Sequence, residues 1–495
     1  GMIENSTSEA SPAEVRSGLA RNAFHLVLGQ IATTGMAILL SAALGRGLGA
    51  ADFGLYFLIT TMASFSLVVV EWGQNLSLVR EVARQPEKAG TLLSSAVELR
   101  TAGTVAAAGL TALAALIAGQ SDRTSLFGAL LVLAMLPFFL AQAFGCVFRG
   151  RERMDFDALL SVLNKSLVLV LTLAALHARL GLPGVIGALA VAGLGTLVAA
   201  ALLAKRIHIV PRRGTWKAAR EVLIGGTPIV AMTITVSAQG YIDALVLARM
   251  APDTVVGWYG AAKNIIGTLI APATILGAAA FPRMSRVAHE PLEFRRELHA
   301  ALRPLLGLAA LAAVGTFLFS DFAVKLIYGS KGFGPAGVTL KVFAPGLFLL
   351  FTDVLLGGAV ASLGLARKLA VVKVLNVATS TVLDILLIPY FQTRYGNGGI
   401  GVVAAFALTE AMMFAAAAWL LPRGTLNLSV ALDIGRALLA GAATLGIFWI
   451  LPKWSDAVRL PLSIVVFAAM AGAVGLVRSS EIAEWREAIA RRVRG

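Results

Sequence analysis

Long apolar runs separated by short polar segments repeat along the whole chain. Each run is at least about 18 residues long, enough for a helix to cross the ~30 Å hydrocarbon core of a bilayer. The pattern therefore predicts an all-α polytopic membrane protein with about fourteen transmembrane helices. The expected spans are 22–45, 54–79, 91–117, 124–148, 156–178, 183–205, 220–248, 255–282, 303–325, 336–362, 369–390, 398–421, 432–452 and 459–478.

The composition agrees with this prediction. Apolar residues make up 58% of the chain and charged residues only 14%, and the mean hydropathy is +0.82, whereas a soluble chain carries about 25% charged residues. The net charge of +15 comes largely from basic loops such as 205–220 and 283–303. Basic loops next to spans face the cytoplasm, so we expect both termini there and no nucleic-acid partner.

A short motif occurs twice, as GAADFGLYFL at 49–58 and MAPDTVVGWYGAA at 250–262. Each copy has a small-residue turn, an acid, a glycine and then an aromatic residue. Six predicted spans separate the copies, so the two halves have the same orientation and are related by an axis along the membrane normal. This predicts two six-helix lobes related by a pseudo-two-fold axis, followed by two C-terminal helices.

The chain then divides into five parts. We expect a cytoplasmic N-terminal tail, a first lobe with spans 1–6, a second lobe with spans 7–12, a terminal pair of spans and a cytoplasmic amphipathic helix. Their bounds are 1–20, 21–206, 207–421, 422–478 and 479–495.

The motifs of common enzyme classes are missing. The sequence has no G-x-x-x-x-G-K-[ST] and no H-E-x-x-H, its five histidines are scattered, and its single cysteine, Cys146, lies within a span. We expect no metal site, no cofactor and no enzymatic activity. Coupling of a transporter to a proton or sodium gradient stays open.

Polar groups inside the spans are the candidate functional residues, because charges cost several kcal/mol in a bilayer and tend to face a cavity or a partner. At 1.5 Å per residue, four of them share a depth of ~12–13 Å from the cytoplasmic ends of their spans. They are Gln30, Glu71, Arg100 and Lys165. Glu71 and Arg100 would form an ion pair or bind substrate, and Lys165 is left as a surplus cation.

The stretch EWGQNLSLVREVAR (71–84) adds further polar groups at the end of span 2. We expect Gln74 and Asn75 to line the cytoplasmic floor of a central cavity. Arg80 and Arg84 would lie at headgroup depth, where a substrate arrives from the cytoplasm. Positive-inside topology alone would also explain these two arginines.

The second lobe has its own charged groups. Asp243 and Lys263 lie near the outer ends of spans 7 and 8, so they can meet as a structural ion pair, and Lys263 is also a candidate for substrate contact. Lys373, another cavity candidate, approaches Asp353 from the cytoplasmic ends of spans 10 and 11. Three more charges have no evident partner: Lys341, Asp384 and Glu410.

Several of these segments resemble one transporter family. EWGQNLSLVREVAR resembles the acidic–x–Gly…Val-Arg-x-x-Ala-Arg signature that ends span 2 in Wzx-type oligosaccharide flippases, members of the multidrug/oligosaccharidyl-lipid/polysaccharide export superfamily. LGAADFGLYFL is similar to the family's LG-x-x-x-F-G-x-Y turn, and the segment from YIDALVLARM to FPRMSR resembles its spans 7–8. One departure is Ala244, where members often carry a basic residue.

The resemblance implies a function. A polyprenyl-diphosphate-linked oligosaccharide would move from the cytoplasmic to the outer leaflet by alternating access, in the cytoplasmic (inner) membrane of a bacterium, for cell-surface polysaccharide biosynthesis. Its partners would be this lipid, the bilayer and other polysaccharide-assembly membrane proteins. The diphosphate would meet Arg100, Lys165 and Lys263, because charge-assisted hydrogen bonds to phosphate are strong.

Two other functions stay open at this point. A drug or cation antiporter of the same superfamily would share the two lobes, but it generally has twelve spans and often an acid in span 1, which this chain lacks. A membrane glycan polymerase or ligase would need a large loop to hold its acceptor, and none is predicted.

Overall fold

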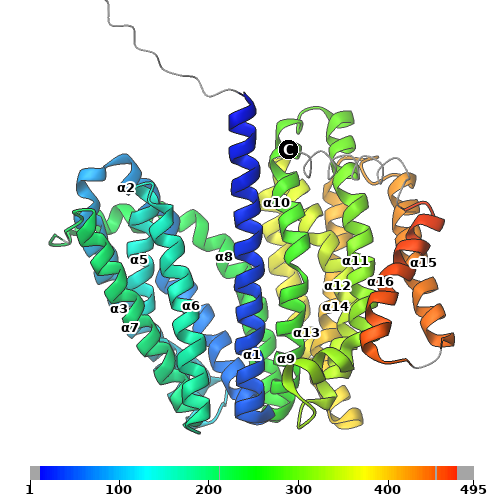
Figure 1. Ribbon diagram of the computed structural model, residues 1–495, viewed down its shortest axis with the longest axis horizontal. Helices are drawn as coiled ribbons and strands as arrows, with labels where there is room; N and C mark the ends of the chain where they lie inside the picture. Colours follow the sequence, from blue (N-terminus) through cyan, green and yellow to red (C-terminus); the bar gives the residue numbers. More distant parts are fainter. Residues whose placement is uncertain (1–11, 211, 452–453, 477–495) are drawn as a thin grey trace, which may run out of the picture.

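A computed structural model describes residues 12–210, 212–451 and 454–476, except for the side chains of 12–33, 228–229, 231–232 and 235–236. Every regular element within these residues is a helix. Figure 1 shows a bundle of long helices with α1 upright in its middle. The all-α membrane architecture is therefore confirmed, while the predicted amphipathic tail at 479–495 lies outside the described residues.

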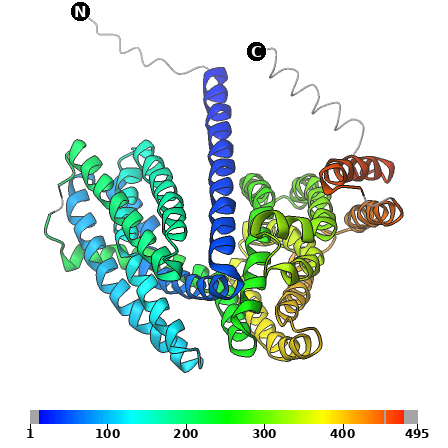
Figure 2. The same cartoon turned by 60° about the horizontal axis from the view of Figure 1, so that its bottom comes forward.

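Two groups of helices lie on either side of α1 (Pro12–Glu71), as Figure 2 shows. Helix α8 (Trp216–Met250) joins them, because it packs against α2 and α3 of the first group and against α13 of the second. The first group contains α2 (Gln74–Arg84), α3 (Ala89–Ile117), α4 (Asp122–Ala134), α5 (Leu136–Gly150), α6 (Met154–His177) and α7 (Gly181–Arg206). The second contains α9 (Asp253–Leu269), α10 (Ala271–Arg286), α11 (Pro291–Tyr328), α12 (Gly334–Ser362), α13 (Ala366–Tyr395), α14 (Gly399–Leu420), α15 (Leu428–Ile450) and α16 (Asp456–Ala473).

The number of spans depends on how broken helices are counted. In the described residues, 11 helices are long and apolar enough to cross a membrane, or up to 12 if the bent pair α9–α10 is one span. The first of these, Thr34–Arg84, contains two predicted spans. Helix α8 coincides with the predicted span 220–248 but is not among these helices. The number of fourteen spans therefore stays a prediction.

Three backbone breaks shape these helices. Gly49 interrupts α1 with φ 77°, a conformation that glycine adopts without steric cost. Trp72 and Gly73, with φ values of 42° and 67°, turn the chain from α1 into α2. Helices α9 and α10 meet at an angle of 40°, because Pro272 at the start of α10 cannot continue the hydrogen-bond ladder.

The two lobes touch closely where α1 breaks, which we call the Gly49 end. A Cβ atom on Gly54 of α1 would overlap the carbonyl oxygen of Asp253, and a Cβ atom on Gly257 of α9 would overlap the carbonyl oxygen of Ala50. Ala50 precedes Gly54 by about one helical turn, and Asp253 precedes Gly257 by the same distance, so the two contacts are reciprocal. Reciprocal contacts are typical of a two-fold interface, and these connect the two copies of the repeated motif.

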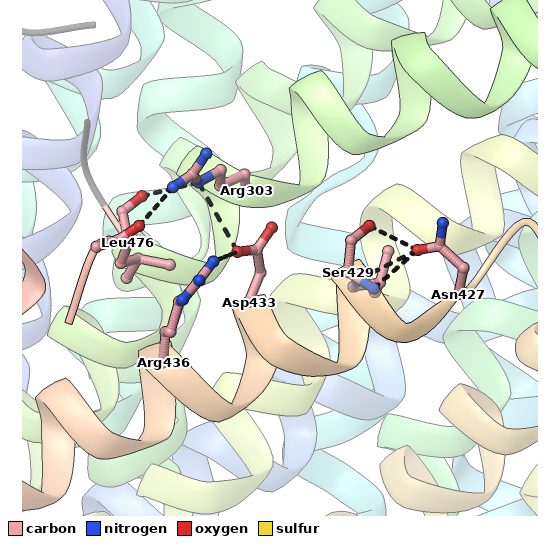
Figure 3. Close-up of polar contacts among 8 residues, drawn as sticks. Arg303, Asn427, Ser429, Asp433, Arg436 and Leu476 are labelled. Carbon is pink, nitrogen blue, oxygen red and sulfur yellow. Dashed lines mark hydrogen bonds and ion pairs between the residues drawn. The ribbon is translucent and has the colours of Figure 1, made fainter. Parts of the chain in front are cut away.

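Helices α15 and α16 lie at the outside of the second group (Figure 2). Arg303 of α11 anchors them, since its Nε donates to the carbonyl oxygen of Leu476 at 2.9 Å and its Nη2 to that of Gly475 at 2.5 Å (Figure 3). Asp433 of α15 lies 3.9 Å from Arg303 and 2.9 Å from Arg436. The terminal pair is thus attached to the lobe by these polar contacts of Arg303 and by the packing of α15 and α16 against α11.

Candidate functional site

A cavity of about 400 Å³ lies between the two halves of α1, α9 and α11. Its polar lining consists of hydroxyl and amide groups, and no charged side chain is among the described residues that form it. The polar lining residues are Ser41, Tyr56, Thr60, Thr61, Ser64, Asn264, Thr268 and Tyr328. We call this space the central cavity. Such groups both donate and accept hydrogen bonds, as the hydroxyls of a sugar do.

Three of these side chains form a chain of hydrogen bonds across the central cavity. The Oγ of Ser41 and the hydroxyl of Tyr328 are 2.7 Å apart, and Nδ2 of Asn264 donates to Ser41 Oγ at 3.2 Å. The residues come from α1, α9 and α11, so the chain connects both lobes. The sequence interpretation missed all three, although each is a polar residue within an apolar span.

A second cavity, of about 290 Å³, lies on the other side of α1, against α5, α6 and α7. Ala37 and Leu40 of α1 line both cavities, so the two cavities are separated only by the width of this helix. Lys165 and Asn164 of α6 supply the polar groups of this second space, which we call the lysine cavity. Asn164 donates to Thr196 at 3.1 Å, whereas Lys165 has no hydrogen bond or ion pair with any described residue.

Arg100 lies elsewhere, buried between α2, α3 and α5 with only 1% of its surface exposed. Its Nη1 donates to the carbonyl oxygen of Phe139 at 2.7 Å and its Nη2 to Oδ1 of Asn75 at 2.8 Å. Its Nε donates to Oε1 of Gln74 at 3.4 Å. These bonds differ from the predicted arrangement, because the guanidinium is held by protein acceptors and lines neither the central nor the lysine cavity.

The other residues of the 71–84 stretch surround this arginine. Glu71 lies close enough to Arg100 for electrostatic attraction, and Gln74 lines a separate space of about 520 Å³ between α1, α3 and α8. Arg80 and Arg84 are exposed on α2, and both approach Glu81, at 3.2 and 3.7 Å. The structure therefore brings Glu71, Gln74 and Asn75 to Arg100, but not to Lys165. Gln30 lies outside the residues whose side chains are described.

Asp243 and Lys263 come into one cluster without a direct ion pair between them among the described residues. Lys263 Nζ donates to the hydroxyl of Tyr259 at 2.9 Å, and Oδ1 of Asp243 accepts from Ser380 at 3.4 Å. Asp384 of α13 lies against Asp243, and Lys263 attracts both carboxyl groups. Direct pairing stays a prediction, and Asp384 is the partner that the sequence did not reveal.

The remaining predicted charges also have places in the second lobe. Lys373 lies near Asp353 and Glu410 and lines neither the central nor the lysine cavity. Lys341 pairs with Asp321 at 3.5 Å. Ala244, at the position where the resemblance leads one to expect a cation, is fully buried.

Comparison with known proteins identifies the family of the chain and solved structures with a similar fold. Residues 19–288 match the model of the family described as "Polysaccharide biosynthesis protein". Because that match covers more than half of the chain, the protein belongs to this family. The predicted membership of the Wzx-type flippases and of their superfamily is confirmed.

Individual relatives are distant. Over 401 residues the chain is 22% identical to the "Probable low-salt glycan biosynthesis flippase Agl15" of Haloferax volcanii, covering 80% of this chain and 81% of that protein. The fold is similar to that of the lipid II flippase MurJ in an inward closed conformation, with a TM-score of 0.72, 13% identity and coverage of 91% and 98%. The fold is also similar to that of an inward-facing multidrug resistance MATE family transporter, with a TM-score of 0.62 and 16% identity. That match covers 78% of this chain and 93% of the transporter. The protein is thus a multi-pass membrane protein of a transporter family and not an enzyme.

Proposed function

We propose that the protein moves a polyprenyl-diphosphate-linked oligosaccharide from the cytoplasmic to the outer leaflet by alternating access of its two lobes. The observation that carries this proposal is the pair of cavities on either side of α1. One carries hydroxyl and amide groups, which suit a glycan, among apolar lining residues. The other holds an unpaired lysine that suits a phosphate.

The closed Gly49 end fits an alternating-access cycle. The predicted topology puts this end outside, so the close contacts of Gly54 and Gly257 would seal the cavities from the outer face. Arg80 and Arg84 would then lie at the cytoplasmic face, where the lipid headgroup arrives. In this scheme Lys165 is the main contact of the diphosphate. Arg100 would reach it only after releasing Gln74 and Asn75.

The test is a translocation assay with the full-length protein in unilamellar proteoliposomes. The probe is a polyprenyl diphosphate that carries a fluorescent disaccharide, and a membrane-impermeant quencher reports its leaflet. We expect Lys165→Gln to slow translocation by roughly ten-fold or more, because it removes a charge-assisted hydrogen bond, and Lys165→Arg to retain most of it.

Lys325→Gln serves as the matched control, since Lys325 is an exposed lysine at the Gly49 end of α11. Equal rates for the wild type, Lys165→Gln and Lys325→Gln would contradict the role of Lys165. Export of a cationic dye by a protein that leaves the lipid-linked probe in place would favour the antiporter alternative instead.

A further inference from the structure

A second group of buried charges lies inside the second lobe, away from the central and lysine cavities. Glu410 of α14 and Asp353 of α12 are only 6% and 9% exposed, and Lys373 of α13 completes the group. Glu410 lies near the middle of α14, ~15 Å from either end at 1.5 Å per residue. The group therefore sits at the depth where water is scarcest.

Neither carboxyl group of this cluster is satisfied. Oε2 of Glu410 and Oδ1 of Asp353 are buried without a hydrogen-bond donor, and no described residue makes an ion pair with either side chain. Helix α14 packs against α12, α13, α9 and α8. Among the charged groups of these helices, Asp353 repels and Lys373 attracts the carboxylate of Glu410. Lys373 also attracts the carboxylate of Asp353.

Two carboxyl groups therefore share one cation in a medium of low dielectric constant. A buried carboxylate without hydrogen bonds is strongly unfavourable, and two neighbouring carboxylates disfavour each other's ionisation. One proton on the pair removes both costs, because it leaves a single carboxylate opposite the single ammonium group. A single shared proton would therefore relieve both carboxyl groups.

A metal ion fits this cluster poorly. Hard cations such as Ca²⁺ prefer six or more oxygen ligands, and no group of three or more acidic, histidine or cysteine side chains suited to a metal occurs in the described part of the chain. The neighbouring hydroxyls of Thr352 and Thr409 donate to carbonyl oxygens of their own helices, at 2.6 and 3.0 Å. The available chemistry is that of a carboxyl pair, which favours H⁺.

We propose that Asp353, Lys373 and Glu410 form a proton-binding site at which Glu410 takes up and releases one proton. Coupling of this proton to lobe movement rests on the proposed flippase function; proton binding itself does not. Lys373 is partly exposed, so the cluster is not fully enclosed by the protein.

The direct test is infrared difference spectroscopy of the full-length protein in lipid nanodiscs between acidic and alkaline pH. The wild type should show the carbonyl band of a buried, protonated carboxyl group that disappears on deprotonation. Glu410→Gln should lose the part of that band that this cluster contributes, since the buried acids Asp243 and Asp384 can contribute a part of their own. Glu293→Gln, which removes a surface carboxylate paired with Arg296, should keep the whole band. An identical band in Glu410→Gln and the wild type would overturn the proposal.

Two further variants test the cluster as a unit. Lys373→Met should shift the loss of the band to higher pH by about one pH unit or more, and Asp353→Asn should shift it to lower pH, because they remove an attractive and a repulsive charge. A band that sodium chloride displaces at constant pH, but potassium chloride does not, would show a cation site and refute a proton site. The spectra need no glycan, so their outcome is independent of the translocation assay with Lys165→Gln.

Discussion

The first and second lobes bury charge in opposite ways. In the first lobe, Arg100 is enclosed by three oxygen acceptors from Gln74, Asn75 and Phe139. In the second lobe, both oxygens of Asp384 and one oxygen each of Asp353 and Glu410 lack a hydrogen-bond partner in the described residues. One lobe thus buries a satisfied cation, and the other buries unsatisfied acids.

This difference separates structural from responsive groups. A buried charge with all its hydrogen bonds made is expensive to disturb, so it fixes the backbone around it. Arg100 holds the two residues that begin α2 against α5, and it thereby fixes the turn at Trp72 and Gly73. An unsatisfied buried acid gains by taking a proton, so its charge can change without breaking a bond. By this argument Arg100 is a structural group of the first lobe, whereas the proton site proposed above would make the second lobe the responsive one.

The largest effect should follow from removing the buried arginine. Arg100→Leu leaves three buried acceptors without their donor, which we expect to lower the free energy of unfolding by about 3 kcal/mol or more. The measurement is the unfolding midpoint of the detergent-solubilised protein. Arg84→Leu is the matched control: Arg84 is exposed and 3.7 Å from Glu81, so its loss should cost less than about 1 kcal/mol.

Equal stability of Arg100→Leu and Arg84→Leu would break the comparison, because Arg100 would then not hold the first lobe. The variant Arg100→Lys tests whether the charge or the shape of the guanidinium group provides the stability. A lysine keeps the charge but lacks the planar fork that reaches separate acceptors, so it should recover only part of the lost stability.

The sequence located most of the helices, because the apolar runs are long. The predicted spans 54–79 and 255–282, however, run through the breaks at Gly73 and Pro272. From the helical rise, the sequence also predicts one depth for Gln30, Glu71, Arg100 and Lys165, and that shared depth stays a prediction. It could not say which way each side chain faces. Rotation of α3 turns Arg100 into the lobe, whereas α6 presents Lys165 to a cavity beside α1.

Partners distant in sequence were harder to predict. Asp384 lies against Asp243 because α13 packs on α8, and no local spacing encodes that packing. The hydroxyls of Ser41 and Tyr328 likewise meet only when α11 reaches α1. The repeated motif predicted two related halves, but not that its two copies contact each other through Gly54 and Gly257.

A smaller effect should follow from disturbing this symmetric contact between the lobes. Gly54→Val places side-chain atoms on the carbonyl oxygen of Asp253, so the closed Gly49 end should lose at least about ten-fold in population, equivalent to ~1.4 kcal/mol. Spin labels at the exposed positions Asp122 and Lys331, in a Cys146→Ser background, should report longer distances between the lobes.

Gly257→Val should behave like Gly54→Val, because the contact is reciprocal. Gly187→Val is the control, since a Cβ atom at Gly187 would have no neighbour within 4 Å. Unchanged distances in both contact variants would show that the lobes tolerate bulk at this end and that the Gly49 end is not a tight closure.

The smallest effect should follow from neutralising a buried acid of the second lobe. Asp384 is 0% exposed and neither of its oxygens has a hydrogen-bond partner in the described residues. Asp384→Asn keeps the shape of the side chain and removes a charge that Asp243 opposes. We therefore expect the free energy of unfolding at neutral pH to change by no more than about 1 kcal/mol, and the change to be stabilising rather than destabilising. Asp243→Asn should cost more, because Asp243 also accepts a hydrogen bond from Ser380, which Asp384 does not. The measurement is again the unfolding midpoint. If Asp384→Asn lost as much stability as Arg100→Leu, the buried charges of both lobes would be structural, and the difference between the lobes would be contradicted.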